Sequence, residues 1–258
     1  MQEHILENRK AVLMQNIKLK GIKNVRDIGG IKINGRTLKN KLLIRGQSLY
    51  YASFEDIKTL VDKYNVKKVI DLRTDMEVSR KPDVEINNVE YCHIPIFNRE
   101  VPGITNHTSN QIIDFSKIYT GMLKEEYLKN ISKIIKEIIY TDGCVYYHCS
   151  EGKDRTGIIS MILLLILGAK KEDILQDYLY TNVVNSYKAN KYYFLTLITT
   201  MNKNKASNIK SFYLAKEEYL NSALDVIEKK YNGIEDFALR GLKLTQEEIE
   251  NFRNKCLE

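Results

Sequence analysis

The chain alternates short β-branched apolar segments with longer stretches that repeat at helical spacing. Four segments have the pattern of strands, at 42–44, 66–72, 89–94 and 144–148, and the second is nearly all apolar in its inner part. Helical patterns lie between and after them. Strands that alternate with helices predict an α/β fold built around one sheet.

Several helix boundaries are marked by local chemistry. Ser53 and Asp56 have the spacing of a capping box, and a long helix is predicted over much of 114–140. The apolar run 158–167 predicts a buried helix that stops at Gly168. The sheet should therefore have helices packed against it.

Everything after Gly168 has helical periodicity. Helices are predicted at 171–182, 186–201, 213–231 and 245–256, the last opening with Thr245 and Glu248 as a second capping box. This C-terminal part forms either a layer over the sheet or, in part, a lid. As a lid it would bring four aromatic residues to the mouth of a pocket: Tyr187, Tyr192, Tyr193 and Phe194. Helical spacing is commonly core spacing, which favours plain packing for most of them.

Length and composition indicate one soluble globular domain. The 258 residues have 43% hydrophobic and 28% charged residues, three prolines, and no linker, repeat or low-complexity tract. We therefore predict a single domain over 1–258, with a sheet-bearing part at about 20–168 and a helical part at about 169–258. The oligomeric state stays open.

The charge is mildly basic and spread along the chain. Forty Lys and Arg against 33 Asp and Glu give a net charge of +7. Such an excess suits anionic substrates but gives little support for a nucleic-acid partner, and none is expected. The longest apolar run, 158–167, is shorter than the roughly 20 residues that cross a bilayer, so stable membrane insertion is not expected either.

Cysteine usage favours a reducing compartment. Cys92, Cys144, Cys149 and Cys256 have neither metal-ligand spacing nor the density of a disulfide scaffold, so reduced thiols, no metal and no cofactor are expected. The first residues lack a basic stretch followed by an apolar run, and no secretory signal is visible. A cytoplasmic location is predicted, and export without a cleaved signal stays open.

One segment carries chemistry. A predicted strand ends at His148 and runs through Cys149 and five further residues to Arg155, where the apolar helix begins. This interval is enough for one tight loop whose backbone N–H groups converge on a point, with the helix N-terminus aimed at the same point. The result is a binding site for a tetrahedral anion.

The side chains of this loop suit phosphoryl transfer. Cys149 is predicted to be a thiolate nucleophile, which converging N–H groups favour at neutral pH, and Arg155 offers a planar fork for two phosphoryl oxygens. Thr156 can donate a hydrogen bond to the sulfur, and His148 is expected to orient the loop rather than act as a base. The predicted substrate-binding residues are Ser150, Glu151, Gly152, Lys153, Thr156 and Gly157, with Gly152 allowing the turn and a close approach of backbone to ligand.

Each of these residues has an ordinary structural explanation when taken alone. Cys149 would be a small buried apolar residue, Arg155 a surface residue and Gly152 an ordinary turn. Jointly, a strand, a Cys-x5-Arg loop that contains Gly, and a helix opening with Thr-Gly form a constellation that chance seldom supplies. The other three cysteines are interpreted as structural.

The loop is similar to the phosphate-binding loop of protein tyrosine phosphatases. Its Gly-Lys-Asp-Arg core resembles the atypical bacterial tyrosine and lipid phosphatases related to the secreted mycobacterial protein tyrosine phosphatase B. Further segments resemble that family at 24–30, 43–49, 71–73 with Glu77, 177–179 and 218–220, and in an expected helix at 231–239. The resemblance covers nearly the whole chain.

The resemblance implies a tyrosine-phosphatase-like, mainly parallel sheet flanked by helices, with a helical C-terminal layer or lid. It also implies metal-free hydrolysis through a cysteinyl-phosphate, with phosphotyrosine, phosphoserine, phosphothreonine or phosphoinositides as substrates. Lys153 would be the cation that meets an additional phosphate of a lipid head group.

One position departs from the family. Asn98 stands where relatives often have an Asp that has been considered for the general acid, and an amide cannot donate a proton as an acid does. Asp154 is the first choice for that role and Asp71 a weaker one. Asp71, Arg73 and Glu77 are expected to form a structural ion-pair network, as are Arg26 and Asp27.

Two other function classes stay open at this stage. One is a phosphate-binding module without turnover, which retention of Cys149, Arg155 and Thr156 argues against. The other is sulfur transfer by a rhodanese-like loop, which also uses a cysteine. The Arg followed by Thr-Gly favours phosphate, and a thiosulfate assay separates the two.

Overall fold

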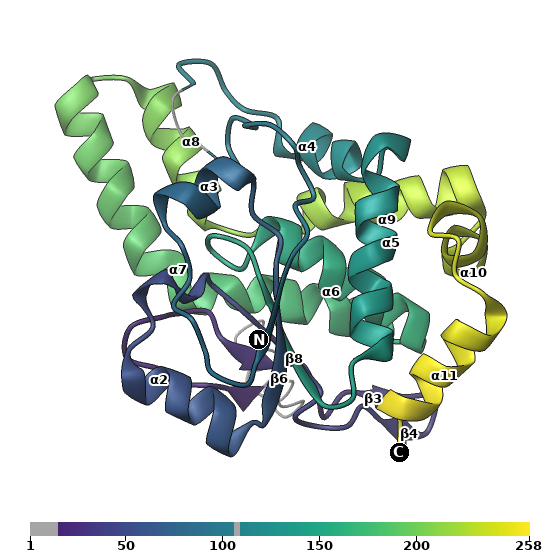
Figure 1. Cartoon of the computed structure of the whole chain (residues 1–258). Coiled ribbons are helices and arrows are strands. Elements are labelled where there is room, and N and C mark those ends of the chain that lie inside the picture. Colours follow the sequence, from purple (N-terminus) through teal and green to yellow (C-terminus); the bar gives the residue numbers. More distant parts are fainter. Residues whose placement is uncertain (1–14, 106–108) are drawn as a thin grey trace, which may run out of the picture.

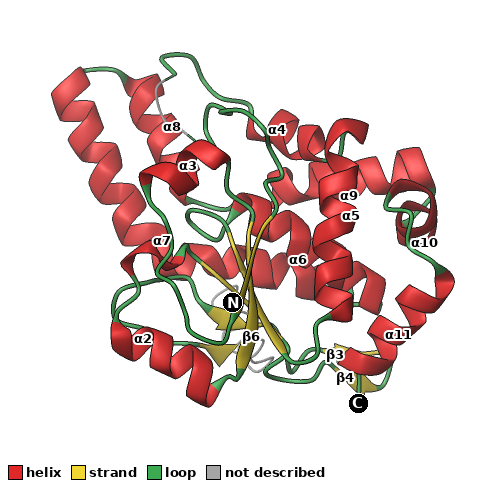
Figure 2. Ribbon diagram, in the orientation of Figure 1, coloured by secondary structure: helices red, strands yellow, loops and turns green. Residues whose placement is uncertain are grey.

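The computed structural model describes residues 15–105 and 109–258, and it has a six-stranded sheet with helices on both faces (Figures 1 and 2). The strands lie in the order β1 (Gln15–Asn16), β2 (Arg26–Asp27), β5 (Leu43–Gly46), β8 (Cys144–His148), β6 (Val66–Asp71) and β7 (Glu90–His93). The last four are parallel, and β1 and β2 are antiparallel to their neighbours. The prediction of a mainly parallel sheet is confirmed.

The helices follow the strands along the chain. They are η1 (Leu49–Tyr51), α2 (Phe54–Lys58), η2 (Thr59–Lys63), α3 (Asp75–Arg80), α4 (Phe115–Met122), α5 (Glu125–Tyr140), α6 (Asp154–Leu167), α7 (Lys171–Thr200), α8 (Lys203–Tyr213), α9 (Glu217–Tyr231), α10 (Ile234–Asp236), η3 (Phe237–Gly241) and α11 (Gln246–Cys256). A small hairpin, β3 (Lys32–Ile33) and β4 (Arg36–Thr37), lies beside α11 in Figure 1. In residues 15–105 and 109–258, no helix has the length and apolar character that crossing a membrane requires.

Strand β8 lies in the middle of the sheet and is buried along its whole length. Successive side chains of a strand point to opposite faces. Val145 and Tyr147 therefore enter the main core, which contains α5 and α6, while Cys144 and Tyr146 enter a smaller core on the face that carries η1 and η2. The carboxyl end of this central strand is the place where open parallel sheets bind ligands.

Helix α6 continues directly from the carboxyl end of β8. It is apolar nearly all round and is buried on almost every position, because it lies between the sheet and the outer helices. The helix ends at Gly168, whose φ of 89° is readily adopted only without a side chain. The predicted buried helix and its stop are confirmed, as are both capping boxes.

Three predicted helices have different boundaries in the structure. The helix expected over 114–140 is divided at Leu123 and Lys124, because Lys124 is extended and starts α5 anew. The helix expected over 213–231 begins only at Glu217, as α9, because Tyr213 is the last residue of α8. The one expected over 231–239 begins only at Ile234, after α9 has ended.

The break predicted near residue 182 does not exist, and α7 is continuous. Polar side chains near this position bind the end of α8 and the residues that follow it. Asn182 exchanges two hydrogen bonds with the backbone of Ala215, at 2.9 and 2.7 Å, and Asn185 donates to the Tyr213 carbonyl at 3.3 Å. These residues join α7 to a later element rather than end it.

Candidate active site

The loop between β8 and α6 is held from behind by two long-range donors. Asn24 donates through Nδ2 to the carbonyls of Glu151 and Gly152, at 2.9 and 3.2 Å, and Arg45 donates to the Gly152 carbonyl at 2.8 Å. A trans peptide directs its N–H opposite to its C=O. The amides that follow these carbonyls therefore face the other side, where an anion would sit.

Gly152 is confined both by its backbone conformation and by close contact with the end of β5. Its φ is 67°, and a Cβ there would lie 2.4 Å from the carbonyl carbon and oxygen of Gly46. The loop thus packs on the end of β5 too closely for any side chain. Gly157 is similarly confined, since a Cβ would lie 3.1 Å from the Tyr178 ring.

Arg155 and Glu77 form a two-point ion pair at the edge of the loop. The Arg155 Nη1 and Nη2 donate to the Glu77 carboxylate at 2.6 and 2.8 Å, and the Ser150 hydroxyl donates to the same carboxylate at 2.5 Å. Burial alone would raise the pKa of Glu77, but Arg155 and these donors lower it to about 2. Burial opposes the charge of Arg155, yet Glu77 raises its pKa above the ordinary value.

Two buried hydrogen-bond donors at the loop have no acceptor among the described residues. Arg155 Nε and Thr156 Oγ1 are buried and lack a hydrogen-bond partner there. The expected bond from Thr156 to the Cys149 sulfur is thus not made in this arrangement. Because Glu77 uses the edge between the two Nη atoms, the Nε–H of Arg155 stays available to an oxygen of a ligand. Buried unpaired donors are costly unless a ligand completes them.

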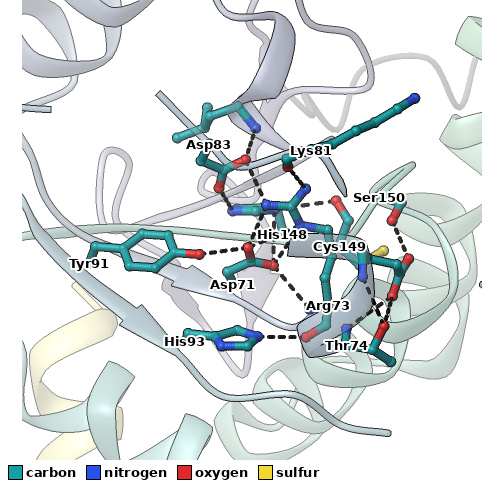
Figure 3. A network of polar contacts seen from close by, with 12 residues as sticks. Asp71, Arg73, Thr74, Lys81, Asp83, Tyr91, His93, His148, Cys149 and Ser150 are labelled. Atoms are coloured by element: carbon teal, nitrogen blue, oxygen red, sulfur yellow. Dashed lines mark hydrogen bonds and ion pairs between the residues drawn. The ribbon is translucent and has the colours of Figure 1, made fainter. Parts of the chain in front are cut away.

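His148 lies behind Cys149 in a buried network of charged residues (Figure 3). Its Nε2 is 2.8 Å from Asp83 Oδ2 and its Nδ1 is 3.8 Å from Asp71 Oδ1. Arg73 pairs with both carboxylates, at 2.6 Å to Asp71 and 2.9 Å to Asp83. Burial would lower the pKa of His148, but Asp83 and Asp71 raise it. This placement agrees with an orienting role for His148.

The network corrects two of the expected assignments. Glu77 does not join Asp71 and Arg73 but pairs with Arg155 instead. Asp71 accepts hydrogen bonds from Arg73 and from the Tyr91 hydroxyl, at 2.8 Å for the latter. Burial would raise its pKa, but His148 and Arg73 hold it well below the ordinary value, which disfavours Asp71 as a proton donor.

This cluster does not fit a metal ion. Ligand atoms of Asp71, Asp83 and His148 lie within 4.8 Å of one another. The Arg73 guanidinium already occupies the space between the two carboxylates, and it supplies the positive charge that an ion would bring. Asp83 follows Pro82 outside every recognised segment, and no sequence pattern indicated that it belongs to this cluster.

Arg26 and Asp27 were expected to form an ion-pair network, but each has other partners in the structure. Arg26 Nε donates to Asp177 at 2.7 Å, and Arg45 pairs with the same carboxylate. Asp27 accepts backbone N–H groups of Gly29 and Lys41, at 2.9 and 2.6 Å. Segments near 24, 45 and 177 therefore meet behind the loop.

Asp154 is buried at the first turn of α6 and is bonded on one oxygen. Its Oδ1 accepts the Tyr119 hydroxyl at 2.6 Å, and Tyr119 is 2.5 Å from the Tyr178 hydroxyl. Burial raises the pKa of both tyrosines well above the ordinary value, so both remain neutral donors. Asn98, in the family's acid position, is exposed on the segment after β7.

Lys153 is neither the surface residue nor the phosphate contact that the sequence allowed. Its side chain is fully buried, and Nζ donates to the carbonyls of Ser211 and Leu214 at 2.8 and 3.1 Å. It also lies 3.3 Å from Asp154 Oδ1. In this arrangement a second phosphate cannot reach the ammonium group, because the end of α8 and the residue after it cover this group.

A cleft of about 410 Å³ opens at the loop. Ser150, Glu151 and Glu77 line it, together with four cationic residues: Arg73, Arg80, Lys81 and Lys188. Tyr192, Phe212 and Tyr213 contribute apolar walls from α7 and α8. A larger hollow of about 700 Å³ lies between α5 and η3, but its lining contains none of the loop residues.

The aromatic residues of α7 do not share one role. Tyr192 lines the cleft, as expected for a lid, whereas Tyr187 is 81% and Phe194 59% exposed. The expectation of plain packing is therefore wrong for these two. Nothing in their helical spacing distinguished a buried stripe from an exposed one.

A family model described as "Tyrosine phosphatase family" matches residues 17–258. A protein of Cupriavidus necator assigned as a tyrosine-protein phosphatase is 26% identical over 64% of this chain and 62% of its own length. A tyrosine-protein phosphatase of Nostoc commune is 30% identical over 44% of this chain and 39% of its own length. The chain thus spans less than two thirds of both relatives.

Solved structures give weaker similarity. The crystal structure of Pseudomonas aeruginosa TpbA has a TM-score of 0.39 at 13% identity, and the match covers 83% of this chain and 99% of that one. The catalytic domain of the PP-IP phosphatase SIW14 of S. cerevisiae has a TM-score of 0.37 at 12% identity, covering 83% and 96%.

Proposed function

The chain belongs to the tyrosine phosphatase family, and on that premise we propose that it hydrolyses phosphate monoesters with Cys149 as the nucleophile. The observation that carries the proposal is the set of donors at the loop. Amides after Glu151 and Gly152 face away from the donors that hold their carbonyls, and Arg155 Nε and Thr156 Oγ1 are buried without partners among the described residues. A phosphoryl group would satisfy these donors together.

The proposed reaction has two steps. The Cys149 thiolate attacks phosphorus, the bond to the leaving oxygen breaks, and that oxygen takes a proton as the alcohol or phenol departs. Water then attacks the cysteinyl-phosphate, the S–P bond breaks, and inorganic phosphate leaves. Arg155 binds phosphoryl oxygens in both steps, and the Thr156 hydroxyl turns to the departing sulfur in the second.

Asp154 is the proposed proton donor. It is on the first turn of α6, where its Oδ1 accepts the Tyr119 hydroxyl and lies beside the Lys153 ammonium group. The other candidate, Asp71, is held ionised by His148 and Arg73, and Asn98 is an amide, which cannot donate a proton as an acid does. After the first step the same carboxylate can accept a proton from the attacking water.

The cleft favours substrates with more than one anionic group. Arg80, Lys81 and Lys188 lie around the loop, and their charges can meet a second phosphate or an acidic residue of a peptide. We therefore transfer to these three residues the role that the sequence suggested for Lys153. Phosphotyrosine, phosphoserine, phosphothreonine and phosphoinositides are the proposed substrates.

The proposed mechanism needs a reduced thiol. Cys149 and the other three cysteines are free, which suits a reducing compartment, and we place the protein in the cytoplasm. No cofactor, metal or nucleic-acid partner enters the proposed mechanism.

One assay separates this function from its alternatives. Phosphopeptides and phosphoinositides are incubated with the protein in the presence of a chelator, and released phosphate is measured. Release that requires Cys149 supports the proposal, whereas binding without release favours a phosphate-binding module. Thiosulfate-dependent sulfur transfer would instead indicate a rhodanese-like activity.

A further inference from the structure

The hairpin of α7 and α8 has an unusual charge composition. Residues 178–216 contain six lysines and neither Asp nor Glu. The chain as a whole has 33 acidic residues among its 258, so this stretch departs from the rest. In Figure 1 the hairpin extends away from the sheet, with its tip far from the central strands. Its surface is therefore positive and projecting.

One face of α7 is exposed and apolar. Val183, Tyr187, Phe194 and Ile198 are 74%, 81%, 59% and 73% exposed. At about 100° per residue these four positions lie within about 60° of one another around the helix axis. Met201, which is 86% exposed, ends the same stripe at the tip.

The opposite face of α7 already has its partners. Asn185, Ala189 and Thr196 are buried, and Ala189 joins Phe212 and Tyr213 in a small apolar cluster separate from the main core. The hairpin is thus closed on its inner side by α8. The exposed stripe faces outward and is not needed to hold the hairpin together.

The same hairpin forms a wall of the cleft. Lys188 and Tyr192 of α7, with Phe212 and Tyr213 of α8, line it beside Ser150 and Glu151. Lys188 pairs with Glu151 at 3.0 Å, which fixes the hairpin to the catalytic loop. Whatever binds the outer stripe is therefore brought close to the mouth of the site.

We propose that the α7–α8 hairpin docks on the surface of an anionic lipid bilayer. An amphipathic helix with aromatic and aliphatic residues on one face and lysines beside them lies in the membrane interface, with its apolar side chains among the acyl chains. Lys191 and Lys203 flank the stripe and would meet the lipid phosphates. Because residues 178–216 contain no acidic side chain, this stretch has no carboxylate that an anionic bilayer would repel.

Charge also argues against a second copy of this chain as the partner that covers the stripe. A symmetric dimer through the stripe would bring two lysine-rich, acid-free surfaces together, and like charges across an interface oppose association. An anionic bilayer has the complementary charge. Docking further implies, on the basis of the proposed function, that the enzyme acts on phosphoinositides in membranes in preference to the same head groups in solution.

Vesicle co-sedimentation tests the docking. The full chain is mixed with phosphatidylcholine vesicles that either contain or lack phosphatidylserine, and the bound fraction is measured over a range of salt. We expect binding to the anionic vesicles that falls with salt. The double variant Phe194→Ser with Ile198→Ser should weaken it by about tenfold or more, and Lys191→Gln with Lys203→Gln should remove the dependence on phosphatidylserine.

Helix α2 supplies the matched control. Phe54 is 80% exposed there and Lys58 is also exposed, so Phe54→Ser with Lys58→Gln removes the same kinds of side chain from another part of the surface. This control should bind vesicles like the parent. Equal loss in the control and the hairpin variants, no binding by the parent, or a parent dimer that Phe194→Ser dissociates would overturn the proposal.

The docking and the catalytic proposal can fail separately. Cys149→Ser should bind vesicles like the parent, because the hairpin is unchanged. The hairpin variants should hydrolyse p-nitrophenyl phosphate at the parent rate, while their rate on vesicle-borne phosphoinositide falls by about tenfold. If the parent binds vesicles but releases no phosphate from any substrate, the catalytic proposal fails and the docking stands.

Discussion

Arg155 and Glu77 are joined by a two-point ion pair, with N–O distances of 2.6 and 2.8 Å, although the two residues are 78 positions apart. Glu77 is held in turn by the Thr74 amide at 3.0 Å at the start of α3. Helix α3 therefore sets the orientation of the guanidinium group, and the loop alone does not.

The Glu77→Gln variant should lower turnover by about ten- to a hundredfold, because an amide holds the guanidinium less firmly and Arg155 loses its orientation. The control is Glu85→Gln, outside this site.

The ion pair between Arg155 and Glu77 should also make the free energy of unfolding depend on pH. Since the pKa of Glu77 falls from 4.5 to about 2 in the folded protein, its contribution of about 3 kcal/mol is present above pH 4.5 and lost as the pH falls toward 2. A parent and variant with the same acid unfolding profile would contradict this role.

The Asp83→Asn variant should lower the pKa of His148, because the imidazolium loses the charge of Asp83. Because Asp83 and Asp71 raise the pKa of His148, the stabilisation is complete below the ordinary value of 6.5 and is lost as the pH rises through the raised value. The variant should cost about 3 kcal/mol at low pH and less at high pH. NMR titration of the imidazole and urea unfolding at several pH values measure both effects. Asp75→Asn, at a side chain 91% exposed, is the control and should change neither.

The Gly152→Ala variant should lose activity and stability together. Its methyl group would enter a space 2.4 Å from the Gly46 backbone, which requires the loop or β5 to move. Gly35→Ala separates this steric effect from backbone strain, because Gly35 has a φ of 83° and nothing within 4 Å of the added carbon. We expect a cost of about 1 kcal/mol at Gly35 and several times more at Gly152, measured by thermal unfolding. Equal costs would show that the contact with Gly46 is unimportant.

The Asp154→Asn variant should discriminate between leaving groups. Proton donation matters most for a poor leaving group, such as a serine or inositol alkoxide, and least for a nitrophenolate. Alkyl phosphates should therefore slow far more than p-nitrophenyl phosphate, and the fall of the parent's turnover toward high pH should flatten. Tyr119→Phe removes the donor to Oδ1 while keeping the ring, and it should shift that pH limb without abolishing it. Uniform losses across leaving groups would reject Asp154 as the acid.

The order of elements and the catalytic loop could be predicted from the sequence because both depend on local patterns. The β-branched segment ending at His148, the glycine-containing loop and the apolar helix α6 are adjacent in the chain, so periodicity and motif spacing were enough. The same holds for the capping boxes at Ser53 and Thr245, where residues three positions apart satisfy each other.

Long-range partners could not be predicted in this way. Glu77 and Asp83 are acidic residues of unremarkable spacing, and only the placement of β6 beside β8 brings them to Arg155 and His148. The burial of Lys153 could not be predicted for the same reason, because the end of α8 that covers it is 58 residues away along the chain. Burial of a charged residue depends on which later element covers it.

The central claim is that phosphate passes through a covalent bond to Cys149. The most direct measurement is acid quenching of the protein during turnover of a phosphotyrosine peptide, followed by mass spectrometry of the peptide that contains Cys149. We expect a phosphorylated Cys149 in the parent, and neither the adduct nor turnover in Cys149→Ser, which should still bind the substrate. Substantial phosphate release by pure Cys149→Ser protein, or an adduct on another residue, would contradict it.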